Sequence, residues 1–467
     1  LYETMFGKYA GHSTTFLYLP DGKTISHDSF IRMAGRSANA LNEMGLAVGD
    51  RVAVQVDKCP EALAVYAACV QSGLVYLPLN AAYTPAEVSY FIENSGAKLF
   101  ICQSSKEDEL VAVAEKCGAL LETFNADGTG SFTELTRNKD DSFKTVERDG
   151  EDLVALLYTS GTTGRSKGAM LSQNNLLSNA ETLVELWKFT EKDVLLHALP
   201  IFHTHGLFVA TNVTLAAGGS MIFMPKFDLD SIIENLPSAT TMMGVPTFYT
   251  RLLNDSRFNK DLTQHMRLFV SGSAPLLAET HVQFEARTGH RILERYGMTE
   301  TNMNTSNPYD GERRAGTVGF PLPGIEIKIT DSKNGETLAE GEIGEIEVRG
   351  PNVFSGYWQM PEKTAEELRK DGFFITGDLG MIDGDGYLHI SGRNKDVIIS
   401  GGYNIYPKEI ELLLDEQPGI MESAVIGLAH PDLGEAVAGI LVAEKGETPD
   451  LNGLAQIISA SLAKYKQ

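Results

Sequence analysis

The chain has 467 residues, of which 43% are hydrophobic and 22% charged, a balance typical of globular enzymes. This length is more than one compact core accommodates, so two or three domains are expected. The net charge of −23 argues against nucleic acid and anionic membranes as main partners, so an anionic ligand would have to meet a local cluster of basic groups.

The chain has four cysteines, Cys59, Cys69, Cys102 and Cys117. Their apolar or helical surroundings lack paired metal-ligand spacing, so we expect reduced thiols in a cytoplasmic protein rather than disulfides. No signal-peptide pattern opens the chain, whose first residue is Leu1. The longest uncharged run, 207–224, contains Asn212 and a Gly-Gly-Ser break, which favours a buried helix followed by a strand over a membrane span.

Strand-like and helix-like segments alternate along the first part of the chain. Apolar strands are predicted at 51–56, 74–80 and 98–103, with helices at 60–73 and 85–94 between them. Near-continuous apolar strands separated by helices are typical of parallel sheets covered on both faces. The alternation resumes at residue 152, so the fold class is expected to be α/β.

A segment rich in glycine and hydroxyl residues, YTSGTTGRSKGAML, follows the apolar strand LVALL at residue 158. Its backbone N–H and side-chain O–H groups can surround phosphate oxygens, and Lys167 adds a positive charge. The spacing differs from that of a P-loop. An isolated run of this composition is usually a flexible surface loop, but the adjoining strand and the lysine favour a phosphate site.

The segment HRILERYGMTETN, at 290–302, predicts a short strand at 291–293 and a tight polar loop at 296–300. Arg295 lies between the two, beside a glycine-containing loop that a ligand can approach closely. An arginine at this place has two interpretations. It can receive an anionic ligand, or it can pair internally with Glu294 or Glu300.

The pattern changes after residue 320. Short alternating strands with Asp-Gly and Asn-Gly turns predict an antiparallel, barrel-like piece up to about residue 394. After Arg393 we expect a helix in PKEIELLLDEQPG, strands in MESAVIGLAH and AVAGILVAEKG, and a final helix ending at Gln467. This last part, 395–467, is interpreted as a small α+β domain.

Six segments together resemble the signature motifs of the adenylate-forming superfamily, which includes acyl-CoA synthetases, peptide-synthetase adenylation domains and luciferases. In chain order they are YTSGTTGRSKG, PIFHTHG (200–206), SGSAPL (271–276), YGMTE (296–300), TGDLG (376–380) and GRNKDVIISGGYNIYPKEIE (392–411). The resemblance spans almost the whole chain. It implies that a carboxylate attacks the α-phosphate of ATP to give an acyl-adenylate and pyrophosphate, and that the thiol of coenzyme A then displaces AMP.

The resemblance also implies a domain arrangement. An N-terminal adenylation domain, 1–394, would consist of two parallel αβαβα-type subdomains over about 1–320 and the β-rich piece over about 321–394. A small mobile lid, 395–467, would follow it and would be incomplete. The domain hinge corresponds to Lys395, and Gly401 and Gly402 would let the CoA pantetheine pass close to the backbone, although Gly401 is also interpretable as a simple turn residue.

The resemblance assigns a nucleotide site. The β- and γ-phosphates of ATP would contact Thr159, Ser160, Gly161, Thr162, Thr163, Gly164 and Lys167. The rest of the ATP site would be formed by Ser273, Ala274, Pro275, Glu294, Arg295, Tyr296, Gly297 and Met298, with Tyr296 stacked on the adenine. Thr299 would contact the α-phosphate, and Glu300 would bind Mg²⁺, a cation that prefers oxygen ligands. Asp378 would accept the ribose hydroxyls with help from Arg393, although alone it has the character of a turn residue.

His203 corresponds to a position between the acyl pocket and the thiol tunnel of family members. A neutral imidazole there can donate to a carboxylate or orient it. A satisfied core histidine is the alternative, and we expect His205 to be one. The chain also departs from the family: it reaches Gln467 before the lysine-containing segment that assists adenylation, and Lys464 and Lys466 lack its context. We expect a trimmed chain; the alternative is a non-catalytic nucleotide-binding protein.

The acyl substrate is indicated by Arg295. Many acyl-CoA synthetases have a small residue there, which opens a tunnel for a long tail. A guanidinium would block that tunnel and pair with a second carboxylate, which indicates a short dicarboxylate, malonate first. His203 and Ser273 would also contact the acid, and Met298 and Met303 would close the pocket unless they are core residues. The phrase ERYGMTETNMNTSNPYDGERR is similar to that of malonyl-CoA synthetases.

Other functions remain open from the sequence. Methylmalonate, succinate or an aryl or acyl monocarboxylate are alternative acids. An adenylation module that loads a carrier protein is an alternative class, against which the absence of a carrier domain in the sequence counts.

Overall fold

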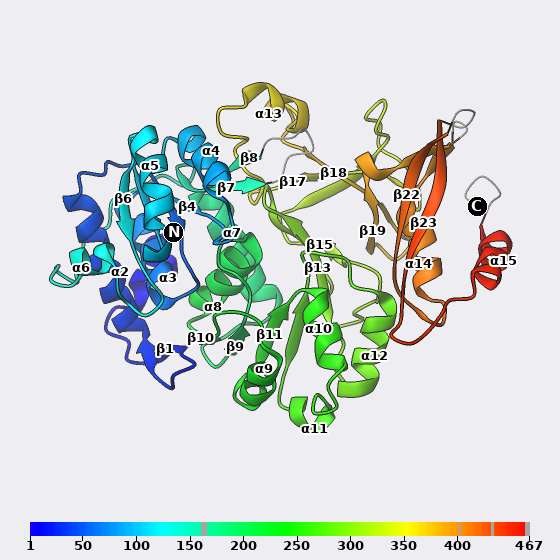
Figure 1. Cartoon of the computed structure of the whole chain (residues 1–467), viewed down its shortest axis with the longest axis horizontal. Helices are drawn as coiled ribbons and strands as arrows, with labels where there is room; N and C mark the ends of the chain where they lie inside the picture. Colours follow the sequence, from blue (N-terminus) through cyan, green and yellow to red (C-terminus); the bar gives the residue numbers. More distant parts are fainter. Residues whose placement is uncertain (160–165, 401–402, 431–433, 463–467) are drawn as a thin grey trace.

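The computed structural model describes residues 1–159, 166–400, 403–430 and 434–462. Several predicted residues lie outside these ranges: Ser160, Gly161, Thr162, Thr163, Gly164, Gly401, Gly402, Lys464, Lys466 and the predicted helix end at Gln467. The described strands form four sheets, which follow one another across the molecule in Figure 1.

The first sheet contains six strands in the order β6-β5-β3-β4-β7-β8. They are β3 (Arg51–Gln55), β4 (Val75–Pro78), β5 (Leu99–Cys102), β6 (Leu120–Thr123), β7 (Leu153–Thr159) and β8 (Lys167–Ser172). All neighbours are parallel except β7 and β8. The helices of this region are α1 (Tyr2–Met5), α2 (His27–Glu43), α3 (Pro60–Ser72), α4 (Pro85–Ser95), α5 (Glu107–Cys117) and α6 (Ser131–Thr136). The predicted alternation of strands and helices is therefore confirmed.

Local sequence explains where these helices begin and end. In α4, the Thr84 side chain accepts a hydrogen bond from the Glu87 N–H, and the Glu87 carboxylate accepts one from the Thr84 N–H, a reciprocal capping box. Pro85 occupies the first turn, where no backbone donor is needed. Gly96 ends the helix with a φ of 61°, a conformation that glycine adopts without strain.

The second sheet contains nine strands in the order β15-β14-β13-β12-β11-β9-β10-β1-β2. They are β1 (Thr15–Tyr18), β2 (Thr24–Ser26), β9 (Val194–His197), β10 (Ser220–Phe223), β11 (Thr241–Gly244), β12 (Leu268–Ser271), β13 (Leu293–Met298), β14 (Asn302–Ser306) and β15 (Phe320–Pro321). The helices are α7 (Gln173–Leu186), the π-helix η3 (His205–Thr211), α8 (Asn212–Ala217), α9 (Leu229–Asn235), α10 (Pro246–Leu253), α11 (Lys260–Thr263) and α12 (Ala278–Thr288). Residues of both sheets contribute to one continuous hydrophobic core.

One prediction in this sheet is wrong. The strand expected at 291–293 begins at Leu293 and continues to Met298, so Tyr296, Gly297 and Met298 lie in β13 rather than in a loop. The physical reason is the antiparallel partner β14, which supplies hydrogen bonds to this part of the backbone. The loop is confined to the turn at 299–301.

The third and fourth sheets are antiparallel, which the sequence predicted for the third sheet. The third contains β16 (Glu326–Thr330), β17 (Gly344–Arg349), β18 (Phe374–Ile382) and β19 (Leu388–Arg393), in that order, with helix α13 (Pro361–Glu367) before β18. The fourth contains β20 (Ile398–Ser400), β21 (Tyr403–Ile405), β22 (Ile420–His430) and β23 (Gly434–Ala443), in the order β21-β20-β23-β22, with α14 (Pro407–Asp415) and α15 (Leu451–Ser461). The fourth sheet and its helices share a separate small core.

Two further expectations concern the whole chain. The four cysteine thiols are free in the structure, as expected. Among the described residues, no helix combines the length and the apolar character needed to cross a membrane. The uncharged run 207–224 instead forms most of the π-helix η3, helix α8 and strand β10.

Candidate functional site

A cavity of about 880 Å³ lies where the first three sheets meet. Eleven of the predicted site residues line it: Thr159, Lys167, His203, Ser273, Arg295, Gly297, Met298, Thr299, Glu300, Arg393 and Lys395. A second cavity of about 830 Å³ is lined by Ala274, Pro275, Glu294, Tyr296 and Asp378. Both cavities share Ser273, Arg295 and Arg393, so they adjoin each other.

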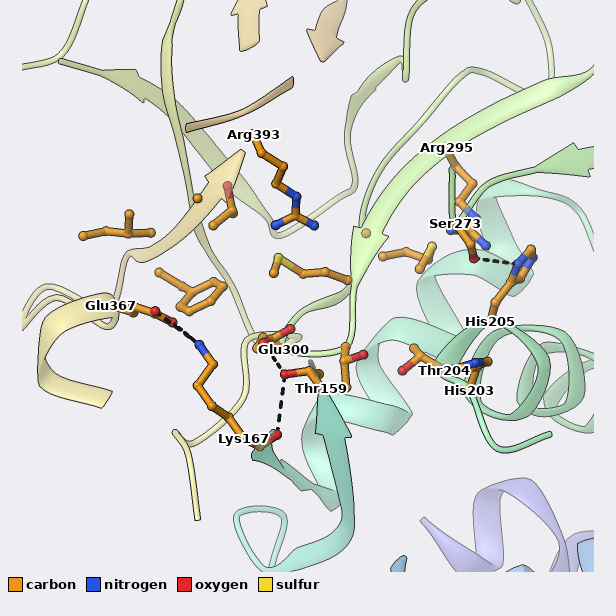
Figure 2. A pocket seen from close by; sticks show the side chains of 18 of the residues that line it. Thr159, Lys167, His203, Thr204, His205, Ser273, Arg295, Glu300, Glu367 and Arg393 are labelled. Carbon is orange, nitrogen blue, oxygen red and sulfur yellow. Dashed lines mark hydrogen bonds and ion pairs between the residues drawn. The ribbon is translucent and has the colours of Figure 1, made fainter. Parts of the chain in front are cut away.

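Arg295 is a cation buried beside both cavities. It lies on β13, where side chains alternate between two faces, and its side chain extends towards Ser273 and His205 (Figure 2). Only 4% of the residue is exposed, and Nε and Nη2 have no hydrogen-bond partner among the described residues. Burial lowers the pKa of Arg295 to about 9, so the guanidinium remains charged at neutral pH. A buried unpaired charge is costly, and an anionic ligand would remove that cost.

The alternative of an internal ion pair for Arg295 is contradicted. The Glu294 carboxylate contacts Nδ1 of His281 at 3.0 Å. The Glu300 carboxylate accepts hydrogen bonds from the Tyr357 hydroxyl at 3.0 Å and from the Thr159 hydroxyl at 3.4 Å. Both carboxylates are occupied elsewhere, and burial raises the pKa of each.

Two neighbouring residues, Gly272 and Ser273, shape the space around the Arg295 side chain. Gly272 packs against the guanidinium so closely that an added Cβ would lie 2.3 Å from Cζ. Ser273, with a φ of 70°, places its hydroxyl 3.1 Å from Nδ1 of His205. A non-glycine residue in this region of backbone space is typical of functional sites.

His205 differs from the prediction. It is buried, as expected, but it is not a satisfied core histidine, because Nε2 has no partner among the described residues. Burial and the Arg295 charge lower its pKa well below the usual value, so the ring is neutral. His203 lines the same cavity, and burial lowers its pKa as well. His205 thus lines the cavity together with Arg295, and the sequence contains no separate signal for it beside His203.

Lys167 lies at the opposite end of the cavity from Arg295 (Figure 2). Its Nζ contacts both carboxylate oxygens of Glu367 at 3.2 Å and lies 4.1 Å from the centre of the Tyr357 ring. The Tyr357 hydroxyl bridges Glu367, at 2.6 Å, and Glu300. Sequence reasoning missed Glu367 and Tyr357; the only signal was their place just before TGDLG, in a stretch without a motif of its own.

Asp378 and Arg393 meet between the two cavities. The register of β18 and β19 places them directly opposite each other, and Nε of Arg393 lies 2.8 Å from the Asp378 carboxylate. The other carboxylate oxygen accepts a hydrogen bond from the Tyr296 hydroxyl. Burial raises the pKa of Asp378. The pair presents a hydrogen-bonding edge at the position that the sequence assigned to the ribose.

The comparisons with known proteins define the class. The pattern of the AMP-binding enzymes matches residues 7–358, and the chain belongs to that family. Among its relatives is a malonate–CoA ligase of Arabidopsis thaliana, 37% identical over 433 residues that cover 88% of this chain and 71% of the relative. A long-chain-fatty-acid–CoA ligase of Bacillus subtilis is 32% identical over 95% of this chain and 86% of its own.

Solved structures give a more specific likeness. The crystal structure of ATP-bound MatB from Rhodopseudomonas palustris is 56% identical, with a TM-score of 0.98, and the match covers 100% of this chain and 92% of that one. The expected α/β fold of an adenylate-forming enzyme is therefore confirmed.

Proposed function

We propose that this protein ligates malonate to CoA with ATP, through a malonyl-adenylate, and releases AMP and pyrophosphate. The observation that carries the proposal is Arg295, a buried cation in a cavity that also contains Lys167 and Glu300; two of its nitrogen atoms have no hydrogen-bond partner in the part of the chain that the structure describes. Relatives named as malonate–CoA ligases support the choice of acid. The four free cysteine thiols are typical of a reducing compartment, which supports the cytoplasm as the place of the reaction.

In the proposed binding mode, the two carboxylates of malonate have different roles. One carboxylate pairs with Arg295, while Ser273, His203 and His205 orient the molecule from the side. The other carboxylate then lies towards Thr299, where one oxygen attacks the α-phosphorus and the bond to pyrophosphate breaks. Neutral histidines suit this task because they donate a hydrogen bond without adding charge.

The proposed ATP site consists of groups that hold the phosphates, the ribose and the base. We propose that Lys167 and Thr159 hold the β- and γ-phosphates, that Asp378 and Arg393 hold the ribose, and that Ser273, Ala274, Pro275, Glu294, Tyr296, Gly297 and Met298 surround the base. Ser160, Gly161, Thr162, Thr163 and Gly164 would complete the phosphate site. These groups fix the nucleotide so that the leaving pyrophosphate lies opposite the attacking oxygen.

Mg²⁺ fits the residues at this end. Glu300 supplies a carboxylate, and the described residues form no cluster of three or more side chains that could hold a metal alone. Glu300 would therefore bind the ion together with phosphate oxygens, as is usual for Mg²⁺. When bound, the ion would stabilise negative charge on the phosphates.

The thioester step requires a second arrangement. We propose that residues 1–394 form the adenylation domain and that 395–467 act as a lid that turns about Lys395. Lys395 lies in a short 3-10 helix (Asn394–Asp396) and lines both cavities. Once the lid turns, the CoA thiol attacks the acyl carbon near His203, and AMP leaves; Gly401 and Gly402 would line its path.

Product analysis tests the proposed function. Incubation of the full-length protein with malonate, ATP, Mg²⁺ and CoA is expected to give malonyl-CoA and AMP in equal amounts, measured by chromatography and mass spectrometry. ADP as the nucleotide product, or no thioester with any acid, would contradict it. Methylmalonate or succinate remain the second candidates because each also offers a second carboxylate to Arg295.

Glu367→Gln is expected to tighten ATP binding by up to about tenfold, because Glu367 competes with the phosphates for Lys167. The variant keeps the hydrogen bonding of the side chain and removes the competing charge. Calorimetric titration with ATP measures the change. The matched control is Glu366→Gln, which removes an exposed neighbouring carboxylate that contacts Lys363 at 2.9 Å. Weaker ATP binding in Glu367→Gln would contradict the competition.

Gly272→Ala is expected to raise the KM for malonate by about tenfold or more and to leave the KM for ATP unchanged. An added methyl group would overlap the Arg295 guanidinium and displace it from its place. Gly439→Ala is the control, because its Cβ would meet only Leu414 Cδ1, at an ordinary 3.7 Å. Steady-state kinetics measures both KM values. An unchanged KM for malonate would contradict the assigned position of the guanidinium.

A further inference from the structure

A partly buried hydrogen-bond chain connects Lys58 to the segment that carries His203 and His205. Lys58 lies just before α3, and His197 is the last residue of β9. Nζ of Lys58 lies 2.9 Å from Nδ1 of His197 and 2.7 Å from its carbonyl oxygen. On the other side of the ring, Nε2 lies 2.9 Å from the carbonyl oxygen of Gly206. The imidazole therefore bridges two parts of the chain that are far apart in sequence.

These contacts determine which ring nitrogen of His197 carries the proton. The Gly206 carbonyl can only accept, so Nε2 must donate. Nδ1 then offers a lone pair, which accepts a hydrogen bond from Nζ of Lys58. Burial, together with the Lys58 charge, lowers the pKa of His197 well below its usual value. The ring is neutral in a single tautomer, and it cannot serve as an acid or a base.

The choice of partner is unusual for an oriented histidine. Such histidines commonly donate to a carboxylate, which favours the protonated ring. Here the partner is the Lys58 amino group, whose pKa burial lowers well below its usual value and whose Nζ also lies 4.4 Å from the centre of the Phe223 ring. A donor at Nδ1 opposes protonation of the ring and leaves the Nε2–H to donate to Gly206. The arrangement suits a residue that holds a backbone group in place.

Gly206 lines the proposed acyl pocket, and the hydrogen bonds to its carbonyl oxygen can hold the backbone there in place. That oxygen accepts a second hydrogen bond, from the Thr211 hydroxyl at 2.9 Å. An added Cβ on Gly206 would lie 2.0 Å from the Pro200 carbonyl oxygen, so the loop between these residues is tightly closed. Gly206 directly follows His205, which begins the π-helix η3 and contacts Ser273. π-Helical turns are frequent at functional sites.

We propose that His197 is a positioning residue of the acyl pocket: it holds the Gly206 carbonyl and thereby His205, and Lys58 sets its tautomer. His197 and Lys58 are absent from the residues that line the cavity, so the effect on malonate is transmitted through the backbone at Gly206. The inference rests on the proposed function, because it concerns how the same pocket receives the acid.

Two substitutions separate the two hydrogen bonds of the ring. In His197→Gln, the side-chain amide can still donate to Gly206 but no longer reaches Lys58. In His197→Asn, the amide oxygen can still accept from Lys58, and the donor to Gly206 is lost. We expect His197→Asn to raise the KM for malonate by about tenfold, and His197→Gln by less than about threefold, with the KM for ATP unchanged in both.

His27 provides a matched control. It is also 1% exposed and contacts a backbone carbonyl through Nε2, that of Gly219 at 3.1 Å, but Gly219, unlike Gly206, does not line the cavity. His27→Asn and His27→Gln are expected to lower Tm without changing the KM for malonate. Equal effects of the two His197 variants, or a rise in malonate KM in His27→Asn as large as in His197→Asn, would overturn the proposal.

A third variant covers the case in which His197→Asn does not fold. Lys58→Met removes the hydrogen-bond partner of Nδ1 and of the His197 carbonyl oxygen but leaves the Nε2 contact with Gly206 in place, and it is expected to raise the KM for malonate about threefold, while the KM for ATP stays constant. An unchanged KM for malonate in that variant would overturn the proposal. Failure of the proposed function is separate: the wild-type protein would then show no malonate-dependent consumption of ATP at all.

Discussion

Arg295→Gly is expected to lower kcat/KM for malonate by about 10³- to 10⁴-fold and to raise it for butyrate. A site built to pair a charged substrate group rejects analogues that lack the group by this order of magnitude. In the wild-type protein, butyrate would leave the buried guanidinium unpaired, at a cost of about 3–5 kcal/mol. The glycine removes both the partner of malonate and the cost of binding an apolar tail.

Arg291→Gly is the control for this experiment. Arg291 lies four positions earlier, but its side chain is 47% exposed and contacts Glu285 on the surface. Surface pairs of this kind contribute little, so both kcat/KM values should stay near those of the wild type. Initial rates of AMP formation with each acid give the comparison. Retention of wild-type malonate turnover by Arg295→Gly would show that the guanidinium does not bind the acid.

Glu300→Gln is expected to lower kcat with malonate by about 10²- to 10³-fold, the size of effect seen when one group that stabilises developing charge is removed. The amide can preserve contacts with Tyr357 and Thr159, so the fold should be unaffected. What changes is the negative charge proposed to bind Mg²⁺. The concentration of Mg²⁺ needed for half-maximal rate should therefore rise together with the loss of kcat.

Glu279→Gln, at an exposed position of helix α12, is the control for charge removal alone and should leave both quantities unchanged. Melting curves of both variants show whether the fold is intact. If Glu300→Gln kept the wild-type dependence on Mg²⁺, the assignment of Glu300 as the metal ligand would be contradicted.

Much of the fold could be predicted because its elements follow apolar periodicity and local caps. Helix α4, for example, begins at a Thr-Pro pair and ends at a glycine, as its capping box explains. Strand β13 shows the limit. Tyr296, Gly297 and Met298 have the composition of a loop, and their pairing with β14, across the turn at 299–301, makes them a strand. The partner strand β14, Asn302–Ser306, is buried but mostly polar, so no apolar pattern in the sequence predicts it.

The site was predictable where a charge stands out in its local sequence. Lys167 ends a segment rich in small residues, Arg295 precedes a glycine in β13, and both line the cavity. Glu367 was not predictable, because its contact with Lys167 joins residues 200 positions apart. Nor was the environment of His205, since a sequence does not show whether both nitrogens of a buried ring find partners. Such properties arise only when separate elements meet.

The most direct test of the proposed function is ATP–pyrophosphate exchange by the full-length protein, without CoA, with malonate, methylmalonate, succinate, acetate and coumarate compared side by side. Exchange requires that the acid itself form an adenylate, so it reports the acyl pocket and the nucleotide site together. We predict the highest exchange with malonate and none above background with acetate or coumarate. Exchange with either monocarboxylate equal to that with malonate would contradict the role of Arg295 and the function built on it.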